Sequence, residues 1–236
     1  MWRDLSIWAT DWLAETRAIF SKEWRSELRT RYALNTVGLF AFTTLVVVSL
    51  SLGPAGTSAA ARPFVPVLLW LILLFAASAG LPRTFVHEEE SRTAIVLRLT
   101  ARPSSLFCGK VLYNLTLLLA IQIVTVPLFL GMLQMPVQAP QQLVLALLVG
   151  GYGLAVGSTL IAAMVAQAQA KGPLFAVLAF PVLMPLLKFA IDATLGASAT
   201  DAVLLDQASV ALSLAVMYDL TLTVAGLMLF PVIWNP

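Results

Sequence analysis

Six uninterrupted blocks of apolar residues, each long enough to cross a lipid bilayer, constrain the fold of this chain most strongly. They cover residues about 35–52, 64–82, 111–133, 142–165, 173–191 and 210–232. About 18 or more apolar residues in a row match the hydrocarbon core of a bilayer. Since lipid offers the backbone no hydrogen-bond partners, each block is expected to cross as an α-helix. Only 11% of the residues are charged, against about 25% in soluble domains. An all-α integral membrane protein with about six transmembrane helices is therefore predicted.

The distribution of lysine and arginine predicts on which side of the membrane each loop lies. Cytoplasmic loops carry an excess of these two residue types. Of the 14 positive residues, all but Arg62 and Lys188 belong to one side. The residues on that side are Arg3, Arg17, Lys22, Arg25, Arg29, Arg31, Arg83, Arg92, Arg98, Arg102, Lys110 and Lys171. Both termini are therefore expected in the cytoplasm.

Residues 1–33 are predicted to form a cytoplasmic amphipathic helix ahead of a six-helix transmembrane domain, residues 34–236. Apolar side chains, tryptophans among them, share one broad face, and most charged side chains share the other. Such a helix lies in the membrane interface; a soluble helix packed on another protein is the alternative. The candidate interfacial residues are Glu23, Glu27, Arg29 and Arg31. Glu23 and Glu27 interrupt the apolar face, so they either reach toward water or meet cations from another segment.

The most informative polar stretch is the loop 83–110, which follows the second span. Its candidate functional residues are Phe85, Glu88, Glu89, Glu90, Arg92 and Arg98. Acidic and hydroxyl residues favour a helix start and Pro103 favours a stop, so one or two short helices are predicted. The loop is either a lever for a soluble partner or a solvated loop whose cations set the topology. Adjacent glutamates on a helix point about 100° apart, so they do not converge on one metal ion.

Two polar residues stand out within the apolar blocks, Asp219 in the sixth and Asn114 in the third. A charged group inside a bilayer costs several kcal/mol unless it is paired, protonated or near water. Asp219 is therefore either an intramembrane functional residue or the partner of a polar group on another helix, such as Asn114 or Gln122.

The sequence offers no recognisable catalytic, metal or nucleotide site. One cysteine and one histidine exclude a zinc site built from several such ligands. The glycine-rich stretch 150–159 lacks the lysine that a phosphate loop requires,. The chain is thus not expected to be an enzyme, and any ATP must bind to another subunit.

Four stretches of the chain resemble the haem exporter protein B family, CcmB. They are Lys22–Tyr32, the loop residues Phe85, Glu88–Glu90, Thr93 and Leu97, the stretch Pro103 with Gly109–Asn114, and the last span with Tyr218–Leu220 and Leu229–Pro231. The likeness extends over nearly the whole chain.

The resemblance implies an ABC-2-like exporter permease in a bacterial inner membrane, serving cytochrome c maturation. It implies a cytoplasmic ATPase subunit as a dimer, companion haem-handling membrane subunits and a periplasmic haem chaperone. ATP would then bind to the partner, haem would be a possible substrate rather than a resident cofactor, and no nucleic acid is expected. Loop 83–110 would be the coupling element. The alternatives are a non-transporting scaffold for haem-handling subunits and an exporter of lipid, glycan or drug.

Overall fold

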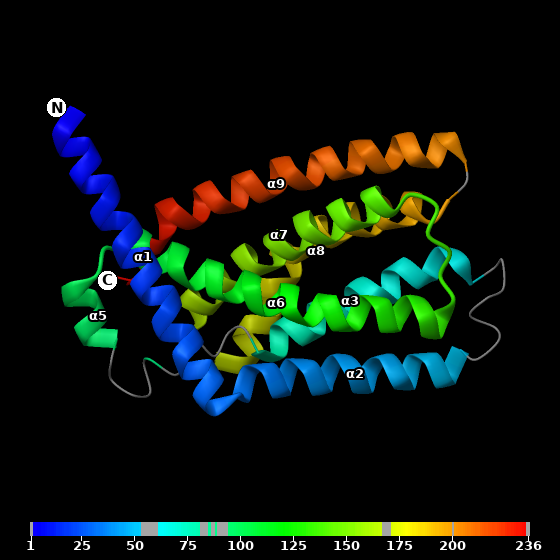
Figure 1. Ribbon diagram of the computed structural model, residues 1–236, viewed down its shortest axis with the longest axis horizontal. Coiled ribbons are helices and arrows are strands. Elements are labelled where there is room, and N and C mark those ends of the chain that lie inside the picture. The colour runs from blue at the N-terminus through cyan, green and yellow to red at the C-terminus, as the bar shows by residue number, and fades with distance from the viewer. Residues whose placement is uncertain are drawn as a thin grey trace.

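The computed structural model describes residues 2–52, 61–80, 85, 88, 94–166, 171–199 and 201–234, and within these ranges the regular elements are all helical. The helices are α1 (Trp2–Thr30), α2 (Tyr32–Leu52), α3 (Val65–Gly80) after the 3₁₀ turn η2 (Arg62–Phe64), α5 (Ala94–Thr100), α6 (Pro103–Leu133), α7 (Pro140–Ala166), α8 (Lys171–Ala197) and α9 (Ala202–Trp234). Both termini, α1 and α5 lie at one end of the bundle (Figure 1).

Six helical segments in the described part are long and apolar enough to cross a membrane, namely α2, η2 with α3, α6, α7, α8 and α9. This confirms the predicted all-α fold with six spans. The chain is therefore a multi-pass membrane protein.

The third span begins earlier than the sequence suggested. The predicted short helix ahead of Pro103 is present as α5, which ends at Thr100. Pro103 itself occupies the first turn of α6, whose helix continues through Lys110 to Leu133. Proline is favoured there because its φ is fixed near the helical value and its missing N–H has no partner to lose. The C-terminal boundary assigned to loop 83–110 is therefore wrong, and residues 103–110 belong to α6.

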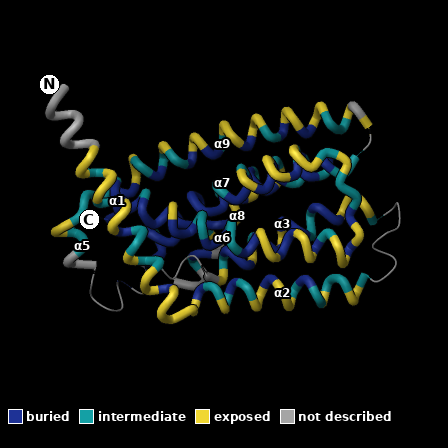
Figure 2. The backbone as a smooth tube through the Cα atoms, viewed as in Figure 1, coloured by how far each residue is buried: buried dark blue, intermediate teal, exposed yellow. Residues whose placement is uncertain are grey.

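Helix α7 forms the centre of the bundle and packs against α6, α8 and α9. Two thirds of its apolar stretch is buried, 67%, against 22% for α2 and for α9 at the edges. Figure 2 shows the exposed outer faces of those two edge helices. Small residues of α7 permit the close packing: a Cβ on Gly150 would meet the ring of Trp70 at 2.2 Å. The glycine-rich stretch is thus a packing surface, as helices in lipid require.

Candidate functional site

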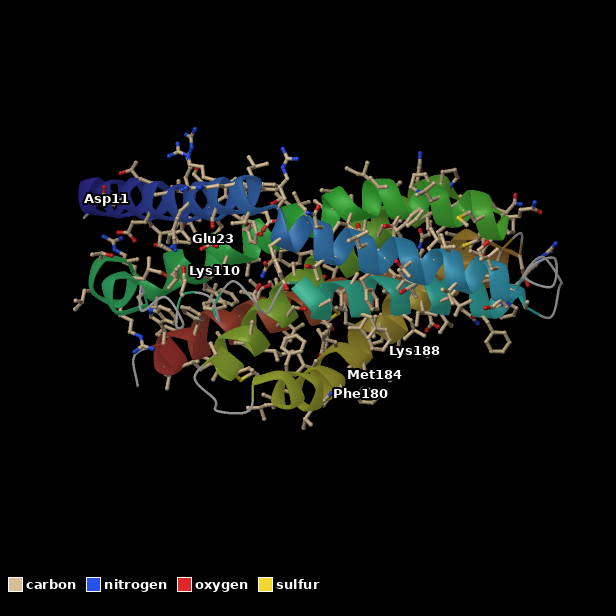
Figure 3. The ribbon with its side chains drawn as sticks, turned by 90° about the horizontal axis from the view of Figure 1, so that it is seen from below. Asp11, Glu23, Lys110, Phe180, Met184 and Lys188 are labelled. Atoms are coloured by element: carbon tan, nitrogen blue, oxygen red, sulfur yellow. The ribbon has the colours of Figure 1, made fainter. Side chains whose placement is uncertain are left out.

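Four charged side chains of alternating sign meet at the end of the bundle that carries both termini. Lys22 and Glu23 come from α1, Lys110 comes from α6, and Glu88 comes from the loop between α3 and α5. Lys110 Nζ lies 3.1 Å from Glu23 Oε1 and 3.0 Å from Glu88 Oε1. Lys22 Nζ lies 2.6 Å from Glu88 Oε1 and 3.5 Å from Glu23 Oε1. Figure 3 shows Glu23 and Lys110 facing each other between α1 and α6. We call these four residues the ion cluster.

The ion cluster is buried on the side of the bundle and open to solvent on the side of Lys22. The side chain of Lys110 is 0% exposed and that of Glu88 is 3% exposed, whereas Lys22 is 48% exposed. The ring of Phe85 covers the Lys110 ammonium, with Nζ 4.5 Å from the ring centroid. Removing charges from water costs several kcal/mol per ion, and only close pairing offsets that cost. The close contacts of Lys110 with Glu23 and Glu88 therefore offset the cost of burying these side chains.

The structure shows the partners of Glu23 and Glu27, the two glutamates that interrupt the apolar face of α1. Glu23 meets a cation from another segment, Lys110. Glu27 instead accepts hydrogen bonds from the Tyr113 hydroxyl (3.2 Å) and the Leu34 amide (2.8 Å). The second bond reaches the first turn of α2, where unpaired amides need an acceptor. Glu27 thus holds the bend between α1 and α2, where Arg31 has a positive φ of 52°.

Two tryptophans fasten the same face of α1 to α6. The indole N–H of Trp12 donates to Ser104 Oγ (3.1 Å), and that of Trp24 donates to Thr116 Oγ1 (2.9 Å). Arg29 and Arg31 remain exposed, and Leu28 is 60% exposed. The face of α1 that carries Trp12 and Trp24 therefore packs on α6. The location of α1 in the membrane interface stays a prediction.

A second contact joins the same loop to α9. Phe85, Phe107, Phe230 and Trp234 form an aromatic cluster, with the Phe85 ring 5.7 Å from Phe230 and 5.9 Å from Trp234. The ring of Phe107 lies 5.4 Å from that of Phe230. The guanidinium of Arg98, on α5, stacks over the Trp234 ring at 5.1 Å. Since Phe85 also covers Lys110, it links the ion cluster to the end of α9.

The structure places only part of the predicted coupling loop. Phe85, Glu88 and Arg98 belong to the contacts above, whereas Glu89, Glu90 and Arg92 lie outside the described residues. Sequence reasoning missed Lys22, Lys110, Phe230 and Trp234 as site residues. Only Glu23 offered a signal, because a charge on an apolar helix face calls for a partner.

Asn114 and Asp219 do not pair with each other. Asn114 Nδ2 donates instead to Thr159 Oγ1 of α7 at 2.8 Å. Asp219 is 4% exposed, and its Oδ1 has no hydrogen-bond partner within the described residues. That oxygen lies against Gly153, where an added Cβ would meet it at 2.1 Å. The alternative in which Asp219 bonds to Asn114 or Gln122 is not realised among the described residues, because the backbone of Gly153 rather than a side-chain amide faces Oδ1.

Glu23 and Lys22 make the stability of the ion cluster depend on pH. Burial alone would raise the pKa of Glu23, but attraction to Lys110 and Lys22 outweighs it and lowers the pKa below 4.5. Burial alone would lower the pKa of Lys22, but Glu88 and Glu23 outweigh it and raise the pKa above 10.5. A lowered acid pKa stabilises the fold above the unfolded value, and a raised base pKa stabilises it below the unfolded value.

We therefore expect the thermal unfolding midpoint to hold between pH 4.5 and 10.5 and to fall as Glu23 protonates in acid. Glu23→Gln should start lower and lose part of this acid dependence. Unfolding followed by circular dichroism in detergent across the pH range measures both. Equal acid slopes in the two proteins would contradict the role given to Glu23.

Comparison with known proteins assigns the chain to a family. Among the described residues, no group of three or more histidine, cysteine, aspartate or glutamate side chains is placed to hold a metal ion. The family model of the CcmB protein matches residues 14–232 of the 236. No curated protein matches the chain. The family match takes in α2 to α8 whole, α1 from Ala14 onward, α9 as far as Val232, the ion cluster and Phe230. The chain therefore belongs to the CcmB family, the membrane permease component of the ABC transporter for cytochrome c maturation.

Proposed function

We propose that this subunit couples ATP hydrolysis by a separate cytoplasmic ATPase dimer to haem export or to release of a loaded haem chaperone. Family membership supports the transporter setting and a bacterial inner membrane. The excess of lysine and arginine at the end with both termini supports a cytoplasmic position for α1, α5 and the ion cluster. Haem is a substrate in this proposal, and ATP binds to the partner.

The observation that carries the proposal is the double attachment of the loop between α3 and α6. Glu88 ties it to α1 and α6 through Lys22 and Lys110. Phe85 ties it to α9 through Phe230 and Trp234. A loop pushed by a partner would therefore move three helices together rather than bend alone. Packed interfaces of this kind switch between discrete arrangements, which is what a coupling element needs.

Helix α5 supplies a surface for that partner. Leu99 of α5 is 83% exposed, and α5 lies at the end of the bundle that carries both termini (Figure 1). The same short helix is held to α9 by Arg98 over Trp234. A contact made at Leu99 would thus be passed directly to α9. An exposed leucine with a charged loop beside it is typical of a protein contact site with an apolar centre and a polar rim.

The structure changes which residues should be used to test the coupling loop. Reversing Glu88 or Arg98 would disturb the cluster contacts and the fold, so loss of the partner would be ambiguous. Glu89→Lys with Glu90→Lys, and separately Leu99→Asp, leave the described contacts in place. Each variant is expected to lower co-purification of the ATPase about thirtyfold, since an interface hot spot is worth about 2 kcal/mol. Arg62→Glu, an exposed residue at the other end, is the matched control and should change nothing.

Full retention of the ATPase by both loop variants would refute the coupling role. A second measurement separates the transporter from a scaffold for haem-handling subunits. Haem handover to the chaperone should stop when the partner ATPase cannot hydrolyse ATP. Handover at the normal rate with that inactive partner would favour the scaffold.

A further inference from the structure

A groove between α7 and α9 opens on the side of the bundle near the middle of the last span. It holds about 370 Å³. Leu148 and Val149 of α7 and Val216 and Leu220 of α9 supply its aliphatic walls, and Tyr152, Asp219 and Thr223 supply its polar groups. Along each helix the lining residues recur at spacings of three and four, so the walls are two parallel ridges. Ridges with this spacing receive the side chains of another helix.

Asp219 is the unusual member of this groove. Asp219 is only 4% exposed, and its Oδ1 has no hydrogen-bond partner in the described part of the chain. Its Oδ1 lies against the backbone of Gly153, and the Leu186 side chain packs against the same glycine; neither residue donates a hydrogen bond to that oxygen. A carboxyl group at this depth is costly without a partner. No described residue supplies a hydrogen-bond partner for Oδ1, so an ionised Asp219 needs one from outside the described residues.

The directions of the neighbouring hydrogen bonds show which kind of partner fits. Thr223 Oγ1 donates to the backbone oxygen of Asp219 at 2.7 Å. The 2.9 Å bond between Tyr152 and Thr223 must then be donated by the Tyr152 hydroxyl. Because both hydroxyl hydrogens are used, the groove presents only acceptors: the carboxylate and the lone pairs of Tyr152. A ligand that binds there must donate hydrogen bonds, and a cation would bind most strongly.

We propose that the α7–α9 groove receives a transmembrane helix of a partner membrane subunit, which places a basic or amide side chain against Asp219. Lipid is a poor match, because headgroup donors lie at the membrane surface while Asp219 lies near the middle of α9. A second copy of this chain is also a poor match. Its lysines within the described spans are already paired, Lys110 with Glu23 and Glu88 and Lys188 with Asp192. The proposal rests on the proposed function only in requiring companion membrane subunits.

The test uses the full complex with its membrane subunits, in a Cys108→Ser background that removes the single native cysteine. A photo-crosslinking amino acid replaces Leu220, which is 64% exposed beside the groove, or Phe180, which is 66% exposed on α8. Phe180 points outward from α8 (Figure 3), so it serves as the control. The Leu220 probe is expected to label a transmembrane segment of a companion membrane subunit, and the Phe180 probe is not. Labelling of lipid alone, or of a second copy of this chain, would overturn the proposal.

Substitutions at Asp219 provide the second arm. Asp219→Leu should lower retention of that companion subunit about tenfold, because a charge-assisted hydrogen bond is lost, and Asp219→Asn should lower it less. Thr221→Leu is the control, since Thr221 is exposed on α9 and its hydroxyl bonds within its own helix. Unchanged retention in Asp219→Leu would refute the proposal. ATPase co-purification should stay intact throughout, which separates this outcome from failure of the coupling role.

Discussion

Replacing Lys110 by methionine is expected to lower the free energy of unfolding by about 3–5 kcal/mol and to release α1 from the bundle. Methionine keeps the length of the side chain and removes its charge. Glu88 is 3% exposed and would keep only Lys22 of the ion cluster as a counter-ion. Glu23 would likewise lose its 3.1 Å contact. Denaturant unfolding in mixed micelles measures the loss, and mobility of a spin label at position 28 on α1 measures the release.

Two controls separate the ion cluster from a general effect of losing a lysine. Lys188→Met removes a lysine that is 68% exposed and paired only within α8, so its cost should stay below about 1 kcal/mol. Exchange of the two charges, Glu23→Lys with Lys110→Glu, restores one opposite-charge pair and should recover part of the stability. If Lys110→Met and Lys188→Met proved equally stable, the ion cluster would not hold α1.

Phe230→Ala is expected to cost about 3–5 kcal/mol, the usual range for removing a buried phenylalanine. Phe230 is 0% exposed and contacts the rings of Phe85, Phe107 and Trp234. Removing the ring leaves a cavity between the loop and α9, so the packing of both segments should weaken. Hydrogen exchange of α5 and of the last turns of α9, measured in detergent, should rise together.

Met228→Ala is the matched control, because Met228 is 72% exposed two residues earlier on the same helix. It should change neither the stability nor the exchange rates beyond about 0.5 kcal/mol. Faster exchange in α9 with unchanged exchange in α5 would contradict the link through Phe85.

Most of the bundle was predictable because bilayer thickness fixes the length of a span. The six spans follow from the length of their apolar blocks, and the amphipathic N-terminal helix follows from its helical periodicity. The position of Pro103 was misjudged because proline both stops a preceding helix and starts a following one. Here both roles apply, and α6 gains residues 103–110, about two turns, which include Lys110.

The ion cluster was only half visible in the sequence. Glu23 on an apolar face called for a cation, yet the same side of the membrane offers many lysines and arginines. To choose Lys110 as the partner, one must know that α1 packs against α6 where Lys110 lies, and this depends on the tertiary structure. Phe230 and Trp234 were hidden for a different reason: aromatic residues at the end of an apolar span are common at membrane interfaces. The sequence could not show that Asp219 lies opposite Gly153 rather than Asn114 or Gln122, because the contact between α7 and α9 depends on the tertiary structure.

The most direct test of the account is whether ATP moves the loop and the bundle together. Spin labels at Thr100 on α5 and Leu214 on α9, in the Cys108→Ser background, report the distance between the loop and the outer half of the last span. In the complex with its ATPase, trapping ATP should shift this distance in the otherwise native protein. The shift should disappear in Lys110→Met while the ATPase stays bound. An identical shift in both proteins, or no shift in either, would contradict coupling through the ion cluster.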